Sequence, residues 1–108
     1  MNARILLAAD HLLLLERELR ALNLWSETAP SADKLESGVP FGVGVIEFEQ
    51  WLQWVFIAKI KVLLEQGSEL PSISGIQPMA EEYYKHDLKR FASLIELLGE
   101  IDQNLGSK

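Results

Sequence analysis

The sequence predicts an all-α fold, a bundle of about four helices near residues 2–23, 46–66, 78–85 and 87–105, with long ordered loops. Two observations support this fold class. Apolar residues recur in steps of three and four in the first and last of these segments, as one face of a helix requires. Glycine and proline gather between the segments, where they favour turns and loops. A chain of 108 residues suffices for one hydrophobic core, so we expect a single domain over 1–108.

The first helix carries more apolar residues than one neighbouring helix would cover. Its inward-facing series is Ile5, Ala8, Leu12, Leu15, Leu19 and Leu22. A second set of leucines widens this stripe: Leu6, Leu7, Leu13 and Leu14. The helix therefore either lies between two others or offers apolar surface to a second chain, as a homodimer through this helix. We expect burial inside the chain.

The connection over residues 24–45 is unusually long. Loops beyond about 12 to 15 residues are uncommon in compact domains unless they are functional, disordered or packed down by their own side chains. A single helical turn is expected near 31–35, with Ser31 as its cap. Large apolar residues should hold the connection across the bundle: Trp25, Leu35, Val39 and Phe41.

The segment 46–66 is apolar over most of its circumference, which predicts a helix buried on all sides. Gly67 is well placed to end it in the left-handed conformation. Three of its aromatic residues are expected in the core: Trp51, Trp54 and Phe56.

Gln50 and Gln53 are the polar exceptions on this middle helix. A buried amide without partners costs about 1 to 3 kcal/mol, so something should satisfy it. We expect one of the two to bind loop backbone from residues 38–45 or 70–77, which would fix those loops on the bundle. The alternative is that Gln53 helps to line a groove for a partner peptide.

The last two helices follow from local signals. Pro78 suits the first turn of a helix over 78–85, because proline lacks the N–H that would stay unpaired there. Asp87 is a reasonable N-cap for the helix over 87–105, which should end at Gly106.

Charge and composition exclude several classes of function. The net charge of −6 disfavours direct binding of nucleic acid, whose affinity comes largely from lysine and arginine displacing counterions. Neither His11 nor His86 has a second histidine or a cysteine at ligand spacing, so both should be surface or capping residues. No nucleophile elbow or phosphate-binding loop occurs. We therefore expect no catalytic residue, no cofactor and no metal.

Location follows from similar arguments. The absence of cysteine fits the reducing cytoplasm, which is the expected location. The longest apolar runs fall far short of the roughly 18 to 20 residues of a membrane-spanning helix, so no membrane association is expected. The apolar run after Arg4 is interrupted by Asp10 and His11, and we interpret it as mature structure rather than a signal peptide.

Several motifs together resemble the YqcC-like family of small bacterial proteins. They are Pro40-Phe41, the run Phe-Glu-Gln-Trp-Leu-Gln-Trp-Val-Phe-Ile over 48–57, Leu70-Pro71, Ile76, and Pro78-Met79-Ala80-Glu81-Glu82. The resemblance spans most of the chain and implies an up-and-down bundle of mainly antiparallel helices. Members are often encoded near a tRNA pseudouridine synthase, which implies an accessory association rather than a shared chemistry.

The chain departs from the family pattern at two places. It has Gly44, Val45 and Ile46 where the family usually has Asp-Thr-Met, and Ala58, Lys59 and Ile60 where the family tends to have Pro-Arg-Met. Any role that depends on that aspartate or arginine is therefore not carried over to this chain.

These observations favour a protein-interaction or accessory module with an unknown protein partner. The alternatives are an accessory role in tRNA pseudouridine modification by association with a synthase, and small-molecule binding under the loops. The predicted interaction groove comprises Trp25, Phe41, Gln53, Trp54, Pro78, Met79, Glu81, Glu82 and Tyr83.

Overall fold

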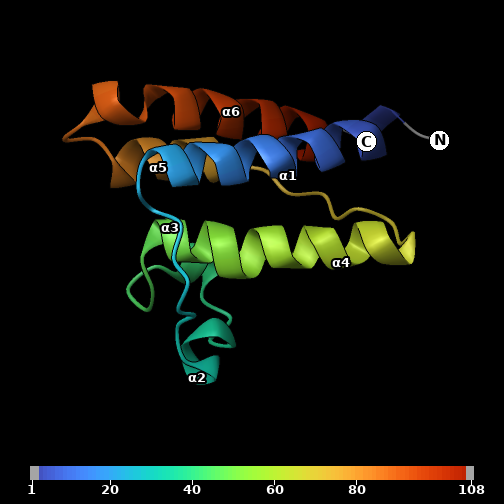
Figure 1. The fold of residues 1–108 in the computed structure, drawn as a ribbon, viewed down its shortest axis with the longest axis horizontal. Helices are drawn as coiled ribbons and strands as arrows, with labels where there is room; N and C mark the ends of the chain where they lie inside the picture. Colours follow the sequence, from blue (N-terminus) through green and yellow to red (C-terminus); the bar gives the residue numbers. More distant parts are fainter. Residues whose placement is uncertain (1–2, 107–108) are drawn as a thin grey trace.

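The structure, a computed structural model, describes residues 3–106, and its long helices alternate in direction along the chain (Figure 1). The elements are α1 (Ala3–Ala21), α2 (Ala32–Leu35), η1 (Pro40–Gly42), α3 (Phe48–Trp51), η2 (Leu52–Ile57), α4 (Ala58–Gln66), α5 (Ile76–Tyr83) and α6 (Leu88–Gly106). Consecutive α3, η2 and α4 form one continuous middle helix over 48–66. α6 packs against both α1 and α5, and α1 also packs against α4. No strand occurs within residues 3–106, so the predicted all-α bundle is confirmed.

The predicted helix boundaries agree with the observed ones to within about two residues, except where the chain is not described. The predicted start of the first helix at residue 2 lies outside the described residues. α5 begins at Ile76, two residues before the predicted start, so Pro78 is its third residue rather than its first. Ser31 does have the extended backbone of an N-cap before α2, but its side chain makes no capping hydrogen bond.

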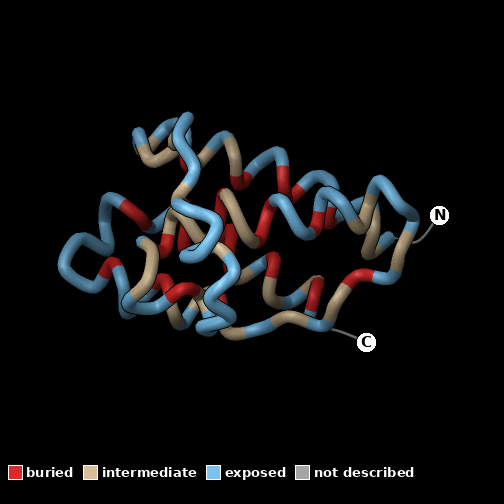
Figure 2. The backbone as a smooth tube through the Cα atoms, turned by 90° about the horizontal axis from the view of Figure 1, so that it is seen from below, coloured by how far each residue is buried: buried red, intermediate tan, exposed pale blue. Residues whose placement is uncertain are grey.

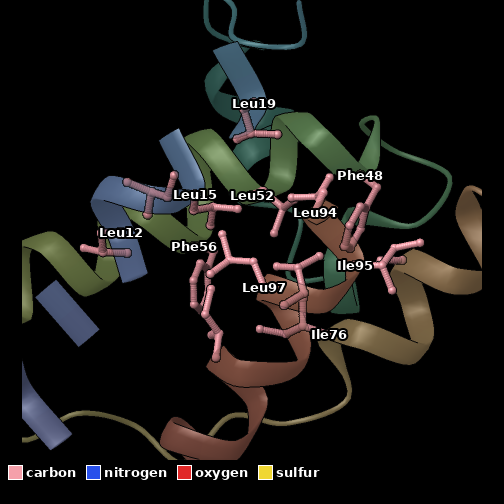
Figure 3. Packing of buried hydrophobic residues seen from close by; sticks show 14 of the residues in the cluster. Leu12, Leu15, Leu19, Phe48, Leu52, Phe56, Ile76, Leu94, Ile95 and Leu97 are labelled. Atoms are coloured by element: carbon pink, nitrogen blue, oxygen red, sulfur yellow. The ribbon is translucent and has the colours of Figure 1, made fainter. Parts of the chain in front are cut away.

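One hydrophobic cluster joins the long helices (Figure 3). Its largest fully buried members are Leu15 and Leu19 of α1, Leu52 and Ile60 of the middle helix, Ile76 of α5, and Leu94, Leu98 and Ile101 of α6. In the tube view the buried residues face one another between the helices, while the connections are mostly exposed (Figure 2). The core is therefore built from one apolar stripe on each of these helices.

The prediction that the second set of leucines on α1 is buried inside the chain is wrong. These leucines are 42% to 71% exposed, namely Leu6, Leu7, Leu13 and Leu14. α6 and α4 cover only the stripe that contains Leu12, Leu15 and Leu19, and no third helix covers the opposite face within the described residues. An apolar face of α1 is left in contact with solvent.

The prediction that the middle helix is covered on all sides also needs correction. Its inner side is buried, but Val62 is 49% exposed, and Trp51 and Val55 are only half-buried. The bundle lies on one side of this helix, and the connection that contains α2 lies on the other (Figure 1). A thin connection covers less surface than a packed helix, so part of the outer side remains accessible.

The middle helix contains a π-helical stretch, η2, that the sequence does not signal. In a π-helix each N–H bonds to the carbonyl five residues earlier, and such stretches occur often at functional sites. Gln53 and Trp54 both lie in this stretch. The π-helical stretch, whose turns are wider than those of an α-helix, therefore lies where the middle helix meets the segment after α1.

Asp102 of α6 caps the start of α5. Its carboxylate accepts hydrogen bonds from the backbone N–H groups of Ile76 at 3.0 Å and Gln77 at 2.8 Å. Gly75, the residue before α5, has no side chain to cap it and adopts the left-handed conformation with φ of 87°. An acidic residue near the end of α6 opposes the dipole of its own helix but stabilises the positive N-terminus of α5.

Arg4 ties the two ends of the described chain together. Its guanidinium donates to the backbone carbonyls of Pro71, Asn104 and Leu105 at 3.0 to 3.1 Å. The Asn104 amide in turn donates to the Arg4 carbonyl at 3.0 Å. The Asn104 and Leu105 carbonyls lie at the end of α6, where the helix dipole is negative, so a cation beside them is favourable.

We predict that Asp102→Ala lowers the free energy of unfolding by about 1 to 3 kcal/mol, because two N–H groups lose a charged acceptor. Urea denaturation followed by circular dichroism measures this change. Glu100→Ala is the matched control, since Glu100 is an exposed acidic residue on the same helix. Equal midpoints for the two variants would show that the cap is unimportant.

Candidate functional site

The structure distributes the nine residues of the predicted groove over three places. Trp25 and Gln53 lie where the segment after α1 crosses the middle helix, and Trp54 follows Gln53 in η2. Phe41 lies in η1, against Trp51. The remaining residues belong to α5: Pro78, Met79, Glu81, Glu82 and Tyr83. Only part of the predicted set can therefore contribute to one binding surface.

Gln53 fixes the segment after α1 on the middle helix. The residue is 6% exposed, and its Oε1 accepts from the Ser26 N–H at 2.8 Å while its Nε2 donates to the Ser26 carbonyl at 2.7 Å. Both ends of the amide are thereby satisfied. A glutamine does bind loop backbone as expected, but the partner is Ser26 and not a residue of 38–45 or 70–77.

Gln50 has a local role. Its Oε1 accepts from the backbone N–H of Glu47 at 2.8 Å and forms half of a capping box at the start of α3. Glutamine three residues after the cap is the position that this motif requires. Gln50 therefore stabilises the first turn of the middle helix rather than a distant loop.

The end of α5 is tied to the start of α3 by two tyrosine–glutamate hydrogen bonds. Tyr83 donates to Glu47, and Tyr84 donates to Glu49 at 2.8 Å. Burial, together with the negative charge of Glu49, raises the pKa of the Tyr84 hydroxyl well above its ordinary value. Tyr84 therefore stays protonated and remains the hydrogen-bond donor to Glu49. This bond holds the end of α5 against the start of the middle helix.

An open groove of about 270 Å³ lies between the connection 34–42 and the outer side of the middle helix. Its walls are Leu35, Val39, Pro40, Phe41, Gly42, Ile46, Trp51, Val55, Phe56 and Ile73, with Lys34, Ser37, Gly38 and Lys59 completing the lining. The groove is therefore mostly apolar, and among the nine predicted residues it includes Phe41. We call it the loop groove.

Backbone conformation shapes one wall of the loop groove. Phe41 has a φ of 56° and Gly42 a φ of 67°, so both are in the left-handed region. The Phe41 ring meets Trp51 edge to face, with the ring centroids 5.0 Å apart. A Cβ at position 42 would lie 2.5 Å from the Ile46 side chain, so glycine is required there. Left-handed phenylalanine is strained, and such strain is common where a loop forms a binding surface.

Lys34 and Lys59 are the charged side chains that line the loop groove. No carboxylate is among its lining residues, although the whole chain has a net charge of −6. Neither lysine forms an ion pair within the described chain. The groove therefore combines an apolar floor with positive charge on an otherwise acidic protein.

The histidines are placed differently from the prediction in one case. His86 is exposed as expected, but His11 is buried in α1, and its Nδ1 has no hydrogen-bond partner within residues 3–106.

No group of three or more histidine, cysteine, aspartate or glutamate side chains within residues 3–106 could hold a metal ion. None of the helices described is long and apolar enough to cross a membrane.

A family model described as DUF446, tRNA pseudouridine synthase C, matches residues 7–104. Protein YqcC of Escherichia coli is 30% identical over 88 residues, which cover 82% of this chain and 81% of that protein. The chain belongs to the YqcC-like family. The solution NMR structure of E. coli YqcC superimposes with a TM-score of 0.83 at 25% identity, covering 98% of this chain and 91% of the other.

Two further relatives differ in what they cover. A Haemophilus influenzae protein, named only as an uncharacterized protein, is 38% identical over 97 residues, which cover 88% of this chain and 92% of that protein. A Pectobacterium carotovorum protein named tRNA pseudouridine synthase C is 35% identical over 57 residues. These span 53% of this chain and only 15% of the Pectobacterium protein. The second match is thus to a short segment of a much longer protein.

Sequence reasoning did not identify the lysines of the loop groove. Lys34 lies in a segment rich in acidic residues, and Lys59 is one of two lysines near the end of the middle helix, where the helix dipole alone explains them. The two lysines lie in separate segments of the chain, so no local pattern places them together.

We predict that Gln53→Leu speeds proteolytic cleavage within residues 26–45 by about tenfold or more, because the Ser26 backbone loses both partners and the connection opens more often. Limited proteolysis followed by mass spectrometry measures the rate and the site. Gln66→Leu serves as the control, because Gln66 is exposed at the end of α4. Cleavage at the wild-type rate would mean that the amide does not hold the connection in place.

Proposed function

We propose that this YqcC-like protein is a small accessory module that binds a protein partner through the loop groove. The observation that carries the proposal is the combination of an apolar floor with Lys34 and Lys59 as the charged lining residues. Protein-binding sites commonly pair a desolvated apolar centre with polar groups at the rim. Here the wide opening between the connection and the middle helix gives a partner access to that centre.

The lining residues favour a particular kind of partner segment. Trp51, Phe41 and Val55 provide a surface for one or two large apolar side chains. Lys34 and Lys59 favour acidic groups beside those side chains, because opposite charges speed association and set the orientation. The proposed ligand is therefore a peptide segment that presents an apolar anchor next to aspartate or glutamate.

The comparisons support a tRNA pseudouridine synthase as that partner. The family description carries this enzyme name, and a segment like this chain forms 15% of a protein named tRNA pseudouridine synthase C. A segment that occurs in one polypeptide with an enzyme in one organism can act beside the separate enzyme in another. The net charge of −6 disfavours direct contact with tRNA, so the module acts on the synthase and not on the RNA. With this role the protein would act in the cytoplasm.

A second candidate is small-molecule binding in the same groove. Its volume of about 270 Å³ lies just below the usual range for ligand pockets, roughly 300 to 1,000 Å³. An apolar carboxylate is the ligand class that its lining would accept. Thermal melting with such compounds separates this function from peptide binding, since a ligand of the folded state raises the midpoint as its concentration increases.

We predict that the purified protein binds a tRNA pseudouridine synthase of the same organism with a dissociation constant of about 10 μM or lower. Isothermal titration calorimetry measures it. The variant Lys34→Glu/Lys59→Glu should bind at least about tenfold more weakly, because both lysines then repel acidic groups of the partner.

Lys61→Glu provides the control, since Lys61 is exposed on α4 and does not line the loop groove. It should bind like the wild type. Absence of binding by the wild-type protein would exclude the proposed partner. Equal weakening by Lys61→Glu would indicate a general charge effect and would contradict the role of the groove.

A further inference from the structure

The exposed leucines of α1 form a continuous stripe along one face of the helix. Taking about 100° per residue, Asp10 and Arg17 lie within roughly 20° of one line along the helix. Leu6 and Leu13 lie about 40 to 60° to one side of this line. Leu7 and Leu14 lie equally far to the other side. We call these six residues the α1 stripe.

The two charged residues of the α1 stripe have no partner within the described chain. Asp10 and Arg17 are both exposed, and neither forms an ion pair or hydrogen bond there. The neighbouring Arg20, by contrast, pairs with Glu16 at 2.8 Å and lies over the Trp25 ring at 4.8 Å. The α1 stripe thus presents one free negative charge and one free positive charge, flanked by leucines that are 42% to 71% exposed.

The spacing of these charges makes the α1 stripe complementary to itself in one orientation. If two copies of α1 lie antiparallel about a two-fold axis between positions 13 and 14, Asp10 and Arg17 are each about 5 Å along the helix from that axis. Asp10 then lies opposite the partner's Arg17, and the pair forms twice. In a parallel, in-register pair each charge would face its own kind, which is unfavourable.

We propose that two copies of this chain associate through the α1 stripe as an antiparallel, two-fold symmetric dimer. Leu13, the most exposed of the leucines at 71%, lies next to the axis, where burial on association is greatest. The helices overlap over residues 6–21, about 24 Å, because the axis falls near the middle of α1. This overlap covers all four exposed leucines.

The α1 stripe is separate from the loop groove. α1 packs on the inner side of the middle helix, whereas the connection with α2 lies beyond its outer side (Figure 1). Dimer formation therefore leaves the groove open for a partner. Failure of either proposal would leave the other untouched, because the two tests use different surfaces and different binding partners.

Light scattering after size-exclusion chromatography tests the dimer. The wild-type protein should have twice the chain mass of 12.2 kDa at high concentration and dissociate on dilution. Asp10→Arg and Arg17→Asp alone should each raise the dissociation constant about tenfold or more, because like charges then face each other. The double variant Asp10→Arg/Arg17→Asp restores opposite charges across the axis and should dimerise like the wild type.

Leu13→Glu should give a monomer, because it places two carboxylates at the axis. Leu88→Glu is the matched control, since Leu88 is also exposed but lies at the start of α6. A wild-type protein that is monomeric at all concentrations would overturn the proposal. So would single charge reversals that dimerise normally, or a double variant that stays monomeric while its circular dichroism shows native helix content.

Discussion

The structure depends on burial of the inner side of the middle helix against α1, α5 and α6. Leu52, Phe56 and Ile60 contribute side chains that are almost completely removed from water. Each such side chain favours folding by about 1.5 to 3 kcal/mol relative to an exposed one. Because α6 packs on α1 and α5 as well, these contacts join elements from both ends of the chain into one cluster. The polar contacts of Arg4 and Asp102 then fix how the helix ends meet.

This arrangement leaves two surfaces that the core does not use. One surface lies on the outer side of the middle helix, beneath the connection between α1 and α3. Gln53 holds one end of this connection, and the packing of Phe41 on Trp51 holds the other. The loop groove lies beside the contact between Phe41 and Trp51. On the far face of α1, exposed leucines surround Asp10 and Arg17, which form no ion pair within residues 3–106. Exposed apolar surface of this kind is typical of sites that bind other proteins, and each proposal concerns one of these two surfaces.

The sequence predicts the helices well because the signals for them are local. Apolar residues recur at helical spacing within each helix, and glycine and proline mark the connections between helices. It predicts exposure less well, since burial depends on how many neighbours a face meets. Leu13 and Leu12 look alike in sequence, yet only Leu12 faces a neighbouring helix. The partner of Gln53 could not be predicted for a related reason: many loop backbones could satisfy an amide, and only tertiary packing brings Ser26 to it. Lys34 and Lys59 become neighbours of one groove only when the connection folds back on the middle helix.

Native-state hydrogen exchange tests most directly whether the middle helix is integral to the core. Amides open either locally or by unfolding of the whole structure, and exchange in increasing denaturant separates the two. If the middle helix holds the fold together, the amides of Ile60, Leu15 in α1 and Leu98 in α6 exchange with the same free energy, that of global unfolding. Exchange of the Ile60 amide at a clearly lower free energy, with α1 and α6 still protected, would show that the remaining helices fold without it.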